Sequence, residues 1–372
     1  MPLTLGVPRE TAQGETRVAL SPETAGRLIK DGFSVVVAPD AGAGAFHSDA
    51  DYQAAGCTIG DAFSADVVLC VSPPSPDQVR DGQTVVGLMD PLGDPQRMQA
   101  LAGSGATILA MELVPRTSRA QKMDALSALS SLAGYRAALL AANGLPKFFP
   151  LLTTAAGTLR PAQVLILGAG VAGLQAIATA RRLGARVSAY DVRAASAEEV
   201  RSLGATFVEL DLGAEDAQDA GGYAKALAED QAERQVRALA VHIAKADVVI
   251  TTALIPGRKA PLLVSADAVA AMAPGAVVVD LAAPGGGNCA LTRVGETVVS
   301  GGVSILGPAN ITAEMPVHAS LVYGRTLAAL VGLIASPDGL TLDMEDDIVQ
   351  GALVAHRGAV VHSRVLGLLG GA

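Results

Sequence analysis

The chain has 372 residues, more than one hydrophobic core usually holds, so its length favours two domains. Half of the residues are hydrophobic, but polar residues or prolines interrupt the longest apolar runs, 137–159 and 321–336, so neither supplies the roughly 18 apolar residues of a membrane-spanning helix. The net charge of −9 argues against a nucleic-acid partner, and the three cysteines (Cys57, Cys70 and Cys289) form no Cys-x-x-Cys pair, so we expect neither disulfides nor a metal site.

The first 115 residues alternate between apolar runs and helical segments, a pattern typical of a parallel α/β sheet. The expected strands are 3–7, 34–38, 66–71, 84–89 and 107–113. Ser21, Pro22 and Glu23 predict a helix start, because serine caps free N–H groups, proline needs none at the first position, and the helix dipole favours glutamate. Gly32 predicts the end of that helix.

A long helix is expected over 119–142, and a second alternation of strands and helices follows it. The expected strands are 163–167, 186–190, 206–210, 247–252 and 276–281, then the pair 296–300 and 303–306; the expected helices are 172–183, 196–203, 230–245 and 265–273. The apolar helix expected over 316–335 has no following strand to cover, so we expect it to return to the first sheet. The sequence therefore predicts two Rossmann-like, doubly wound α/β domains with mostly parallel sheets, the first discontinuous (1–126 plus 312–372) and the second covering 127–311.

The second alternation carries the motif Gly168-x-Gly170-x-x-Gly173. In a chain this rich in glycine, chance alone supplies about half an occurrence, so the context decides. Here a strand enters the loop, a helix leaves it, and the next strand ends at Asp191. The first glycine makes the tight turn, the second admits the pyrophosphate and the third lets helix and strand pack closely, while helix N–H groups bind the phosphates. The alternative is a glycine-rich structural turn without a ligand.

Asp191 predicts which dinucleotide binds. Its carboxylate can accept hydrogen bonds from the ribose hydroxyls of NAD(H) and would repel the 2′-phosphate of NADP(H). Arg193, two residues further on, weakens that argument because a cation can accommodate a 2′-phosphate.

Longer motifs follow one another along almost the whole chain. They are VPRE (7–10), ETRVA (15–19), PRTSRAQKMD (115–124), LAGYR (132–136), GGYAK (221–225), TTALIPG (251–257), DLA (280–282) and GGNC (286–289). In these motifs the sequence closely resembles the NAD(H)-binding component, domain I, of the proton-translocating transhydrogenases.

The resemblance implies a split α-subunit that ends after its soluble domain and binds NAD(H). Its partners would be a membrane-spanning α-2 subunit and an NADP(H)-binding β-subunit, and it would form a homodimer. The chain would then lie in the cytoplasm, peripheral to the inner membrane through its partners and without inserting into it.

The resemblance also implies roles for single residues. Arg116, Gln121, Asp124 and Ser127 resemble the family's polar cluster around the nicotinamide and its ribose. Beyond the three glycines, the positions that match nucleotide contacts are Val171, Ala172, Asp191, Val192, Arg193, Gln235, Ala253 and Leu254, and Gly222 and Tyr223 match a mobile loop that closes on the nucleotide. Residues 128–131 (ALSS), 284–285 and 309–312 depart from common family forms, which leaves contacts with the NADP(H) subunit open.

Hydride transfer between two nicotinamides needs no general acid or base, so we expect the Arg116 cluster to orient the nicotinamide. The alternative is a plain ion pair between Arg116 and Asp124, either within a helix or in its cap region. Alanine dehydrogenase, which shares this architecture, needs a lysine and a histidine instead. The corresponding segments, 68–74 and 87–91, contain neither residue. A non-catalytic NAD-binding sensor is the other alternative.

Overall fold

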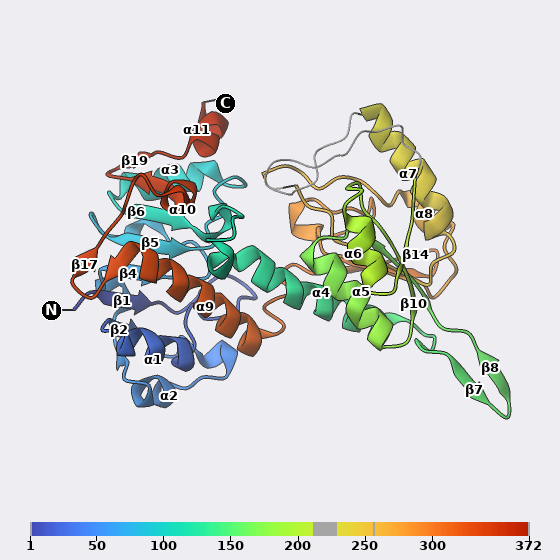
Figure 1. Cartoon of the computed structure of the whole chain (residues 1–372), viewed down its shortest axis with the longest axis horizontal. Coiled ribbons are helices and arrows are strands. Elements are labelled where there is room, and N and C mark those ends of the chain that lie inside the picture. Colours follow the sequence, from blue (N-terminus) through green and yellow to red (C-terminus); the bar gives the residue numbers. More distant parts are fainter. Residues whose placement is uncertain (1, 211–228, 256, 371–372) are drawn as a thin grey trace. The chain divides into compact units, whose positions relative to one another are not determined.

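The computed structural model describes residues 2–210, 229–255 and 257–370. These residues fall into two compact units. Unit 1 comprises Met1–Leu129 and Thr312–Ala372, and unit 2 comprises Ser130–Ile311. Each unit is built around its own sheet, and Figure 1 labels some of the strands of each.

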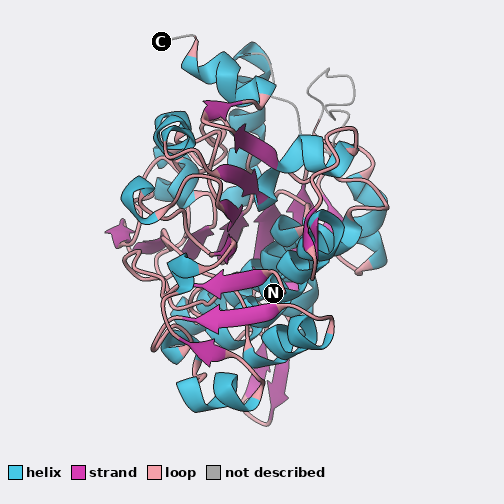
Figure 2. Ribbon diagram, turned by 90° about the vertical axis from the view of Figure 1, so that its left-hand side faces the viewer, coloured by secondary structure: helices cyan, strands magenta, loops and turns pink. Residues whose placement is uncertain are grey.

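Unit 1 contains an eight-stranded sheet in the order β19-β18-β6-β5-β4-β1-β2-β3. The strands are β1 (Thr4–Val7), β2 (Ser34–Val37), β3 (Thr58–Ile59), β4 (Val67–Leu69), β5 (Thr84–Gly87), β6 (Thr107–Ala110), β18 (Leu353–His356) and β19 (Ala359–Val360). The first six are parallel; β18 then pairs antiparallel with β6, and β19 pairs antiparallel with β18. Helices accompany the strands (Figure 2); they are α1 (Pro22–Lys30), α2 (Asp49–Ala54), α3 (Pro95–Gly103), α9 (Pro316–Ile334), α10 (Asp347–Ala352) and α11 (Ser363–Leu369).

The local signals in unit 1 act as expected. The Ser21 side chain accepts a hydrogen bond from the Thr24 N–H, and Pro22 is the first residue of α1. Gly32 adopts a φ of +99° just beyond the helix end, a left-handed conformation that glycine adopts without a Cβ clash. The cap and the stop predicted from the sequence are confirmed.

The apolar helix α9 packs on unit 1, which confirms that it returns to the first sheet. The Ser320 hydroxyl accepts from the Val18 N–H at 3.0 Å, and the buried Tyr323 hydroxyl donates to the Cys70 carbonyl at 2.8 Å. A Cβ on Gly324 would lie 2.9 Å from the Ala19 carbonyl, so only glycine permits this close approach.

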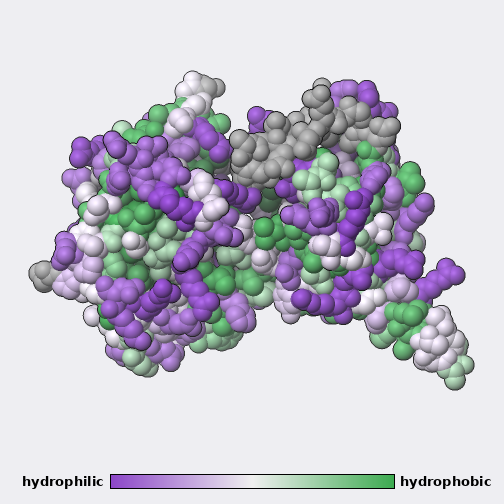
Figure 3. Space-filling view, viewed as in Figure 1, coloured by the Kyte–Doolittle hydropathy of each residue, from purple (hydrophilic) through white to green (hydrophobic). Residues whose placement is uncertain are grey.

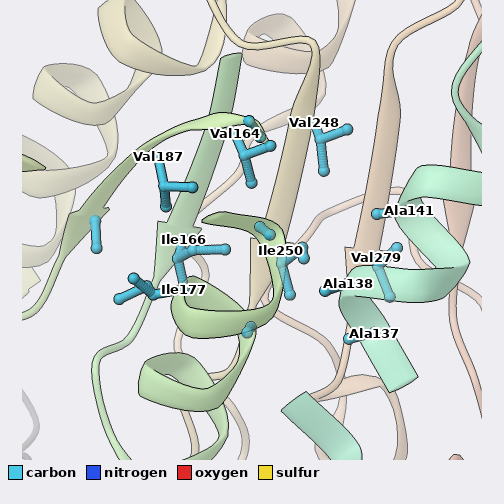
Figure 4. Close-up of a cluster of buried hydrophobic side chains, with 14 of the residues drawn as sticks. Ala137, Ala138, Ala141, Val164, Ile166, Ile177, Val187, Val248, Ile250 and Val279 are labelled. Atoms are coloured by element: carbon cyan, nitrogen blue, oxygen red, sulfur yellow. The ribbon is translucent and has the colours of Figure 1, made fainter. Parts of the chain in front are cut away.

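Unit 2 contains a seven-stranded sheet in the order β11-β10-β9-β12-β13-β15-β14. The strands are β9 (Gln163–Leu167), β10 (Arg186–Tyr190), β11 (Thr206–Phe207), β12 (Val248–Thr251), β13 (Val277–Asp280), β14 (Thr297–Ser300) and β15 (Val303–Leu306), and only β14 runs antiparallel. The helices are α5 (Val171–Arg182), α6 (Ser196–Ser202), α7 (Glu229–Ile243) and α8 (Ala266–Ala270). Valine and isoleucine side chains of the central strands pack against α5 and the alanines of α4 (Ala125–Gly144), as Figure 4 shows. The predicted fold class, two doubly wound Rossmann-like sheets, is confirmed.

Several boundaries differ from the expectation. The helix expected from residue 119 begins at Ala125, because residues Gln121–Met123 form a 3₁₀ turn and Asp124 then caps α4 by accepting from the Ser127 N–H. The strand expected over 206–210 pairs only at Thr206–Phe207. The hairpin of β7 (Leu152–Thr154) and β8 (Gly157–Leu159) and the C-terminal strands β18 and β19 were not expected.

Two helices of the described residues, α4 and α9, are long and apolar enough to cross a membrane by length and composition alone. Half of the apolar window of α9 is buried inside the fold, as in the core helix of a soluble protein. Both helices begin ahead of the apolar runs 137–159 and 321–336, so the expectation that neither segment is long and apolar enough to span a membrane was wrong.

Candidate functional site

The glycine loop of unit 2 has the geometry of a dinucleotide fingerprint. It joins β9 to α5, next to the point where the strand order reverses between β9 and β12. Gly168 adopts a φ of +99°. A Cβ on Gly173 would lie 1.9 Å from the Gly168 carbonyl oxygen, so α5 can approach the strand end only with glycine there. The first and third glycines therefore have the roles that the motif assigns to them.

Gly170 has a different environment. The nearest described atom to a Cβ placed on it would be Arg193 Nη2 at 4.0 Å, so the protein leaves open the space in which this glycine admits a ligand. Gly170 is the N-cap of α5, and the exposed Val171 and part-buried Ala172 are the first two residues of that helix. The N–H groups of a first helical turn have no partner within the helix and bind phosphate. The loop thus fits a pyrophosphate.

Asp191 follows β10 and is only 9% exposed. Its carboxylate accepts from the Ala169 N–H at 2.7 Å and from the N–H of Arg193 at 2.9 Å. The Arg193 guanidinium adds a bidentate ion pair, with Nε and Nη2 each 2.9 Å from a carboxylate oxygen. The structure therefore brings the predicted acidic residue to the glycine loop, together with Arg193.

Val192 and Gln235, two further positions predicted to contact the nucleotide, are less exposed than Val171. Val192 is partly buried against the core. Gln235 is 4% exposed, and its side-chain amide donates to the Tyr190 hydroxyl at 3.1 Å. Burial raises the pKa of that hydroxyl to about 12. Gln235 thus supports the end of β10, and its contact with nucleotide stays a prediction.

The strand order of the sheet reverses between β9 and β12, and we call this place the switch point. The segment after β12 lies on the side of the switch point opposite the glycine loop. Ala253 is held through both of its backbone groups, because its N–H donates to Asn288 Oδ1 at 3.0 Å and its carbonyl accepts from Asn288 Nδ2 at 2.9 Å. Thr252 Oγ1 donates to the Gly168 carbonyl at 3.1 Å, which ties this segment to the glycine loop. Leu254 is 49% exposed, as a residue that contacts a ligand would be.

A buried carboxylate behind this segment has a role that the sequence did not reveal. Asp280, at the end of β13, is fully buried and accepts five hydrogen bonds. Its donors are the Thr251 and Thr292 hydroxyls and the N–H groups of Ala282, Asn288 and Cys289. Asp280 thereby fixes Asn288, and Asn288 fixes Ala253. The motifs DLA and GGNC contained both residues, but only their spatial proximity assigns them this positioning role.

Three of the four residues assigned to the nicotinamide come together in unit 1. Asp124 accepts from the Ser127 N–H at 2.8 Å and from its hydroxyl at 2.6 Å, and Arg116 Nε lies 3.8 Å from Asp124 Oδ2. Gln121 is exposed at the start of the neighbouring 3₁₀ turn. Asp124 is thus a helix cap as well as the centre of the cluster, which is the cap-region form of the ion-pair alternative. Its role toward a nicotinamide stays a prediction.

Arg119 anchors the loop that carries Arg116. Its guanidinium pairs with Asp346, at 2.6 and 2.8 Å, and with Asp347. Asp346 is also the N-cap of α10, and the Arg119 hydrogen bonds lower the pKa of its carboxyl to about 2. Residue 119 lay inside the long PRTSRAQKMD motif, but its partner is more than 200 positions away and could not be read from the sequence.

Unit 1 has a cavity of about 330 Å³ at its own switch point, between the ends of β1 and β4. Glu10 lines it and accepts from the N–H groups of Val71 and Ser72 at 2.6 and 3.0 Å. Burial raises the pKa of Glu10 to about 7. None of the described residues that line this cavity is a lysine or a histidine, and its cations are Arg9 and Arg97.

Two predicted residues, Gly222 and Tyr223, lie outside the described residues. All three cysteines are buried and free.

Comparisons with known proteins agree with this geometry. Residues 6–133 match the alanine dehydrogenase/PNT N-terminal domain, and residues 137–363 match the alanine dehydrogenase/PNT C-terminal domain. The chain is 42% identical to the first part of NAD(P) transhydrogenase subunit alpha of Rhodospirillum rubrum, over 98% of this chain and 99% of that protein. The crystal structure of transhydrogenase from Sinorhizobium meliloti is 44% identical and superposes with a TM-score of 0.86, over 96% of this chain and 100% of that one.

Alanine dehydrogenase is a more distant relative. The enzyme of Bacillus subtilis is 33% identical over 76% of this chain and 71% of that protein. The fold, the fingerprint and the transhydrogenase relatives together establish NAD(H) as the nucleotide of this chain. The chain therefore belongs to the alanine dehydrogenase/PNT family and, within it, to the NAD(P) transhydrogenase alpha subunits.

Proposed function

We propose that this chain is the NAD(H)-binding subunit of a proton-translocating transhydrogenase. It would take part in direct hydride transfer between NADH and NADP⁺ held on a partner subunit, coupled to proton movement across a membrane. Bound NADH supplies the hydride. The observation that carries the proposal is the pairing of a complete NAD fingerprint in unit 2 with an Arg116–Asp124–Ser127 cluster that contains no proton-transfer histidine or lysine.

The roles of the residues follow from this chemistry. Gly168, Gly170 and Gly173 hold the pyrophosphate at the N-terminus of α5, and Asp191 reads the adenosine ribose. Arg116, Gln121, Asp124 and Ser127 orient the nicotinamide and its ribose. Correct orientation of two reactants can lower a barrier by about 7–11 kcal/mol, so positioning alone is a sufficient task for these residues.

A partner must supply the second nucleotide. The Rhodospirillum rubrum relative is named as a portion of one subunit, alpha, which supports further subunits in the same complex. We assign these as a membrane-spanning α-2 subunit and an NADP(H)-binding β-subunit, which would hold this chain at the cytoplasmic side of the inner membrane. Co-sedimentation of the chain with membranes that contain the two partners, and its loss from membranes without them, tests this assignment.

We also propose a homodimer. The hairpin β7–β8 and its flanks expose Phe148, Leu151, Leu152 and Leu159, and apolar surface is visible at the hairpin in Figure 3. Contiguous exposed apolar side chains mark interaction surfaces. Analytical ultracentrifugation of the chain, and of a variant with Leu151 and Leu159 changed to serine, tests whether this surface holds a second copy. A wild-type monomer would contradict the proposal.

Hydride exchange provides the test of function. The chain is mixed with a separately prepared NADP(H)-binding subunit and an NAD analogue, and reduction of the analogue by NADPH is followed by absorbance. We expect a rate well above that of either protein alone. NADH binding without exchange would favour the non-catalytic sensor, and NADH oxidation that requires pyruvate and ammonia would favour an alanine dehydrogenase.

A further inference from the structure

The acid that reads the ribose has no spare acceptor site in this structure. A carboxylate offers about four lone-pair positions for hydrogen bonds. Those of Asp191 are taken by the Ala169 N–H, the Arg193 N–H, and Arg193 Nε and Nη2, all at 2.7–2.9 Å. Two ribose hydroxyls would raise the number of donors on this carboxylate to six, one more than the buried Asp280 accepts, so a ribose can bind Asp191 through both hydroxyls only after existing donors leave.

The donors that can leave belong to the Arg193 side chain. The other two are backbone N–H groups, one of them in the glycine loop itself, and moving them would disturb the loop that binds pyrophosphate. The Arg193 side chain retains 18% exposure and rotates about single bonds. Its departure opens two acceptor positions, one on each carboxylate oxygen. That number matches the two hydroxyls of the ribose.

The guanidinium also has a second place to bind. Arg193 Nη2 lies 2.9 Å from Asp191 Oδ2 and 4.0 Å from the position of a Cβ on Gly170. The guanidinium therefore lies between the Asp191 carboxylate and Gly170, the glycine at which the dinucleotide pyrophosphate approaches the backbone. A guanidinium binds phosphate in the same bidentate way as a carboxylate, so a phosphate there can replace the partner that Arg193 gives up.

We propose that the Arg193 side chain blocks the ribose site until a dinucleotide binds, and we call this arrangement the lock. In the free protein the Arg193 guanidinium is hydrogen-bonded to the Asp191 carboxylate. When a dinucleotide binds, its phosphates bind the guanidinium instead, and the Asp191 carboxylate becomes available to the ribose hydroxyls. Phosphate binding and ribose binding thereby become coupled, and Arg193 acts as a specificity-determining residue that favours adenosine accompanied by phosphate over adenosine alone. This inference rests on the proposed function, because it takes NAD(H) as the ligand of the loop.

The test measures the affinities of adenosine and ADP by isothermal titration calorimetry. In the wild type we expect ADP to bind far more tightly than adenosine. In Arg193→Met, adenosine should bind about tenfold more tightly because the lock is absent, while ADP should bind more weakly because its phosphates lose the guanidinium. Arg193→Lys should restore part of the phosphate preference, and Arg182→Met, an exposed arginine of α5, should change neither affinity.

A second measurement uses only the wild type and does not depend on any variant folding. Inorganic pyrophosphate should strengthen adenosine binding, because it removes Arg193 from Asp191, and adenosine should strengthen pyrophosphate binding by the same factor. An unchanged adenosine affinity in pyrophosphate, or an Arg193→Met variant that loses adenosine and ADP affinity equally, would overturn the lock. If the wild type binds NADH and these couplings are absent, only the lock fails; if the wild type does not bind NADH, the proposed function fails with it.

Discussion

The two units share a topology but treat their switch points differently. In both, parallel strands reverse their order, between β1 and β4 in unit 1 and between β9 and β12 in unit 2. In unit 2 only residues 168–170 separate β9 from α5, so a helix N-terminus meets the crevice. In unit 1 residues 8–21 separate β1 from α1, and no such helix start follows the strand directly.

The backbone N–H groups at the two points have correspondingly different partners. In unit 1 the N–H groups of Val71 and Ser72 bind the Glu10 carboxylate, so the protein itself supplies the acceptor. In unit 2 the first turn of α5 keeps its N–H groups for a phosphate. The comparison teaches that both doubly wound sheets provide a crevice, and that only in unit 2 does a short first loop bring the free N–H groups of a helix start to it.

A substitution of the buried Asp280 tests how much its hydrogen bonds stabilise the strand ends of unit 2. In Asp280→Asn, an NH₂ group, itself a donor, replaces one carboxylate oxygen and meets the donors that this oxygen had bound. Each oxygen accepts at least two hydrogen bonds, so at least two charge-assisted hydrogen bonds are lost. Each is worth about 1.5–3 kcal/mol, so we expect the free energy of unfolding to fall by about 3–6 kcal/mol. Urea unfolding with hydrogen exchange should place the loss in unit 2. Equal loss in Asp267→Asn, an exposed residue of α8, would refute a specific role for Asp280.

The corresponding change in unit 1 alters the pH dependence of stability. The pKa of Glu10 rises from 4.5 to about 7 on folding, so the native state holds a proton that the unfolded chain releases. The contribution of Glu10 to stability is then greatest below pH 4.5 and is lost as the pH rises through 7, a change of about 3 kcal/mol. Because burial also raises the pKa of Glu112 to about 7, Glu10→Gln should reduce the decline in the free energy of unfolding between pH 5 and pH 8 by about half rather than abolish it. The exposed Glu23→Gln should keep it, and an unchanged decline in Glu10→Gln would count against the buried acid.

A substitution of Gly173, the third glycine of the fingerprint, tests whether the close packing of α5 in unit 2 is needed for nucleotide binding. In Gly173→Ala the new methyl group would lie 1.9 Å from the Gly168 carbonyl oxygen and push α5 away from the strand end. We expect NADH affinity to fall about 100-fold, equivalent to about 2.7 kcal/mol, measured by fluorescence titration. Gly332→Ala in α9 meets nothing within 4 Å and serves as the control. Normal NADH binding by Gly173→Ala would show that close packing of α5 is not required.

The smallest expected effect concerns nucleotide choice. Asp191→Ala removes the acceptor of the ribose hydroxyls and also the charge that repels a 2′-phosphate. NADH should therefore lose about tenfold more affinity than NADPH, equivalent to about 1.4 kcal/mol. The ratio of the two dissociation constants by calorimetry measures this. Equal losses for both nucleotides would mean that Asp191 does not read the ribose.

Local signals carried the sequence-based prediction wherever one short segment determines a feature. The Ser21 cap, the Gly168 turn and the buried valine strands depend on neighbours in the chain, and each is present as expected. Asp124 shows the limit, because a polar residue that caps a helix and one that continues it look alike in a helical pattern.

Features that depend on distant partners could not be read in this way. The strands β18 and β19 have short, ordinary sequences and acquire their place only by pairing beside β6. The Asp280 hub and the Arg193 ion pair likewise depend on which side chains meet in space. The sequence predicted that Asp191 lies beside the glycine loop, but not the hydrogen bonds that already occupy it.

The return of α9 has a consequence for how the protein is made. During synthesis the ribosome releases residues 1–129 long before residues 312–372. Until then the first sheet lacks the hydrogen bonds of Ser320 and Tyr323 and the pairing of β18 with β6. Unit 2 is continuous and can fold in the meantime. The nascent chain therefore carries a finished nucleotide domain beside an unfinished one, and a ribosome that stalls before codon 312 leaves an open β6 edge exposed to chaperones and proteases.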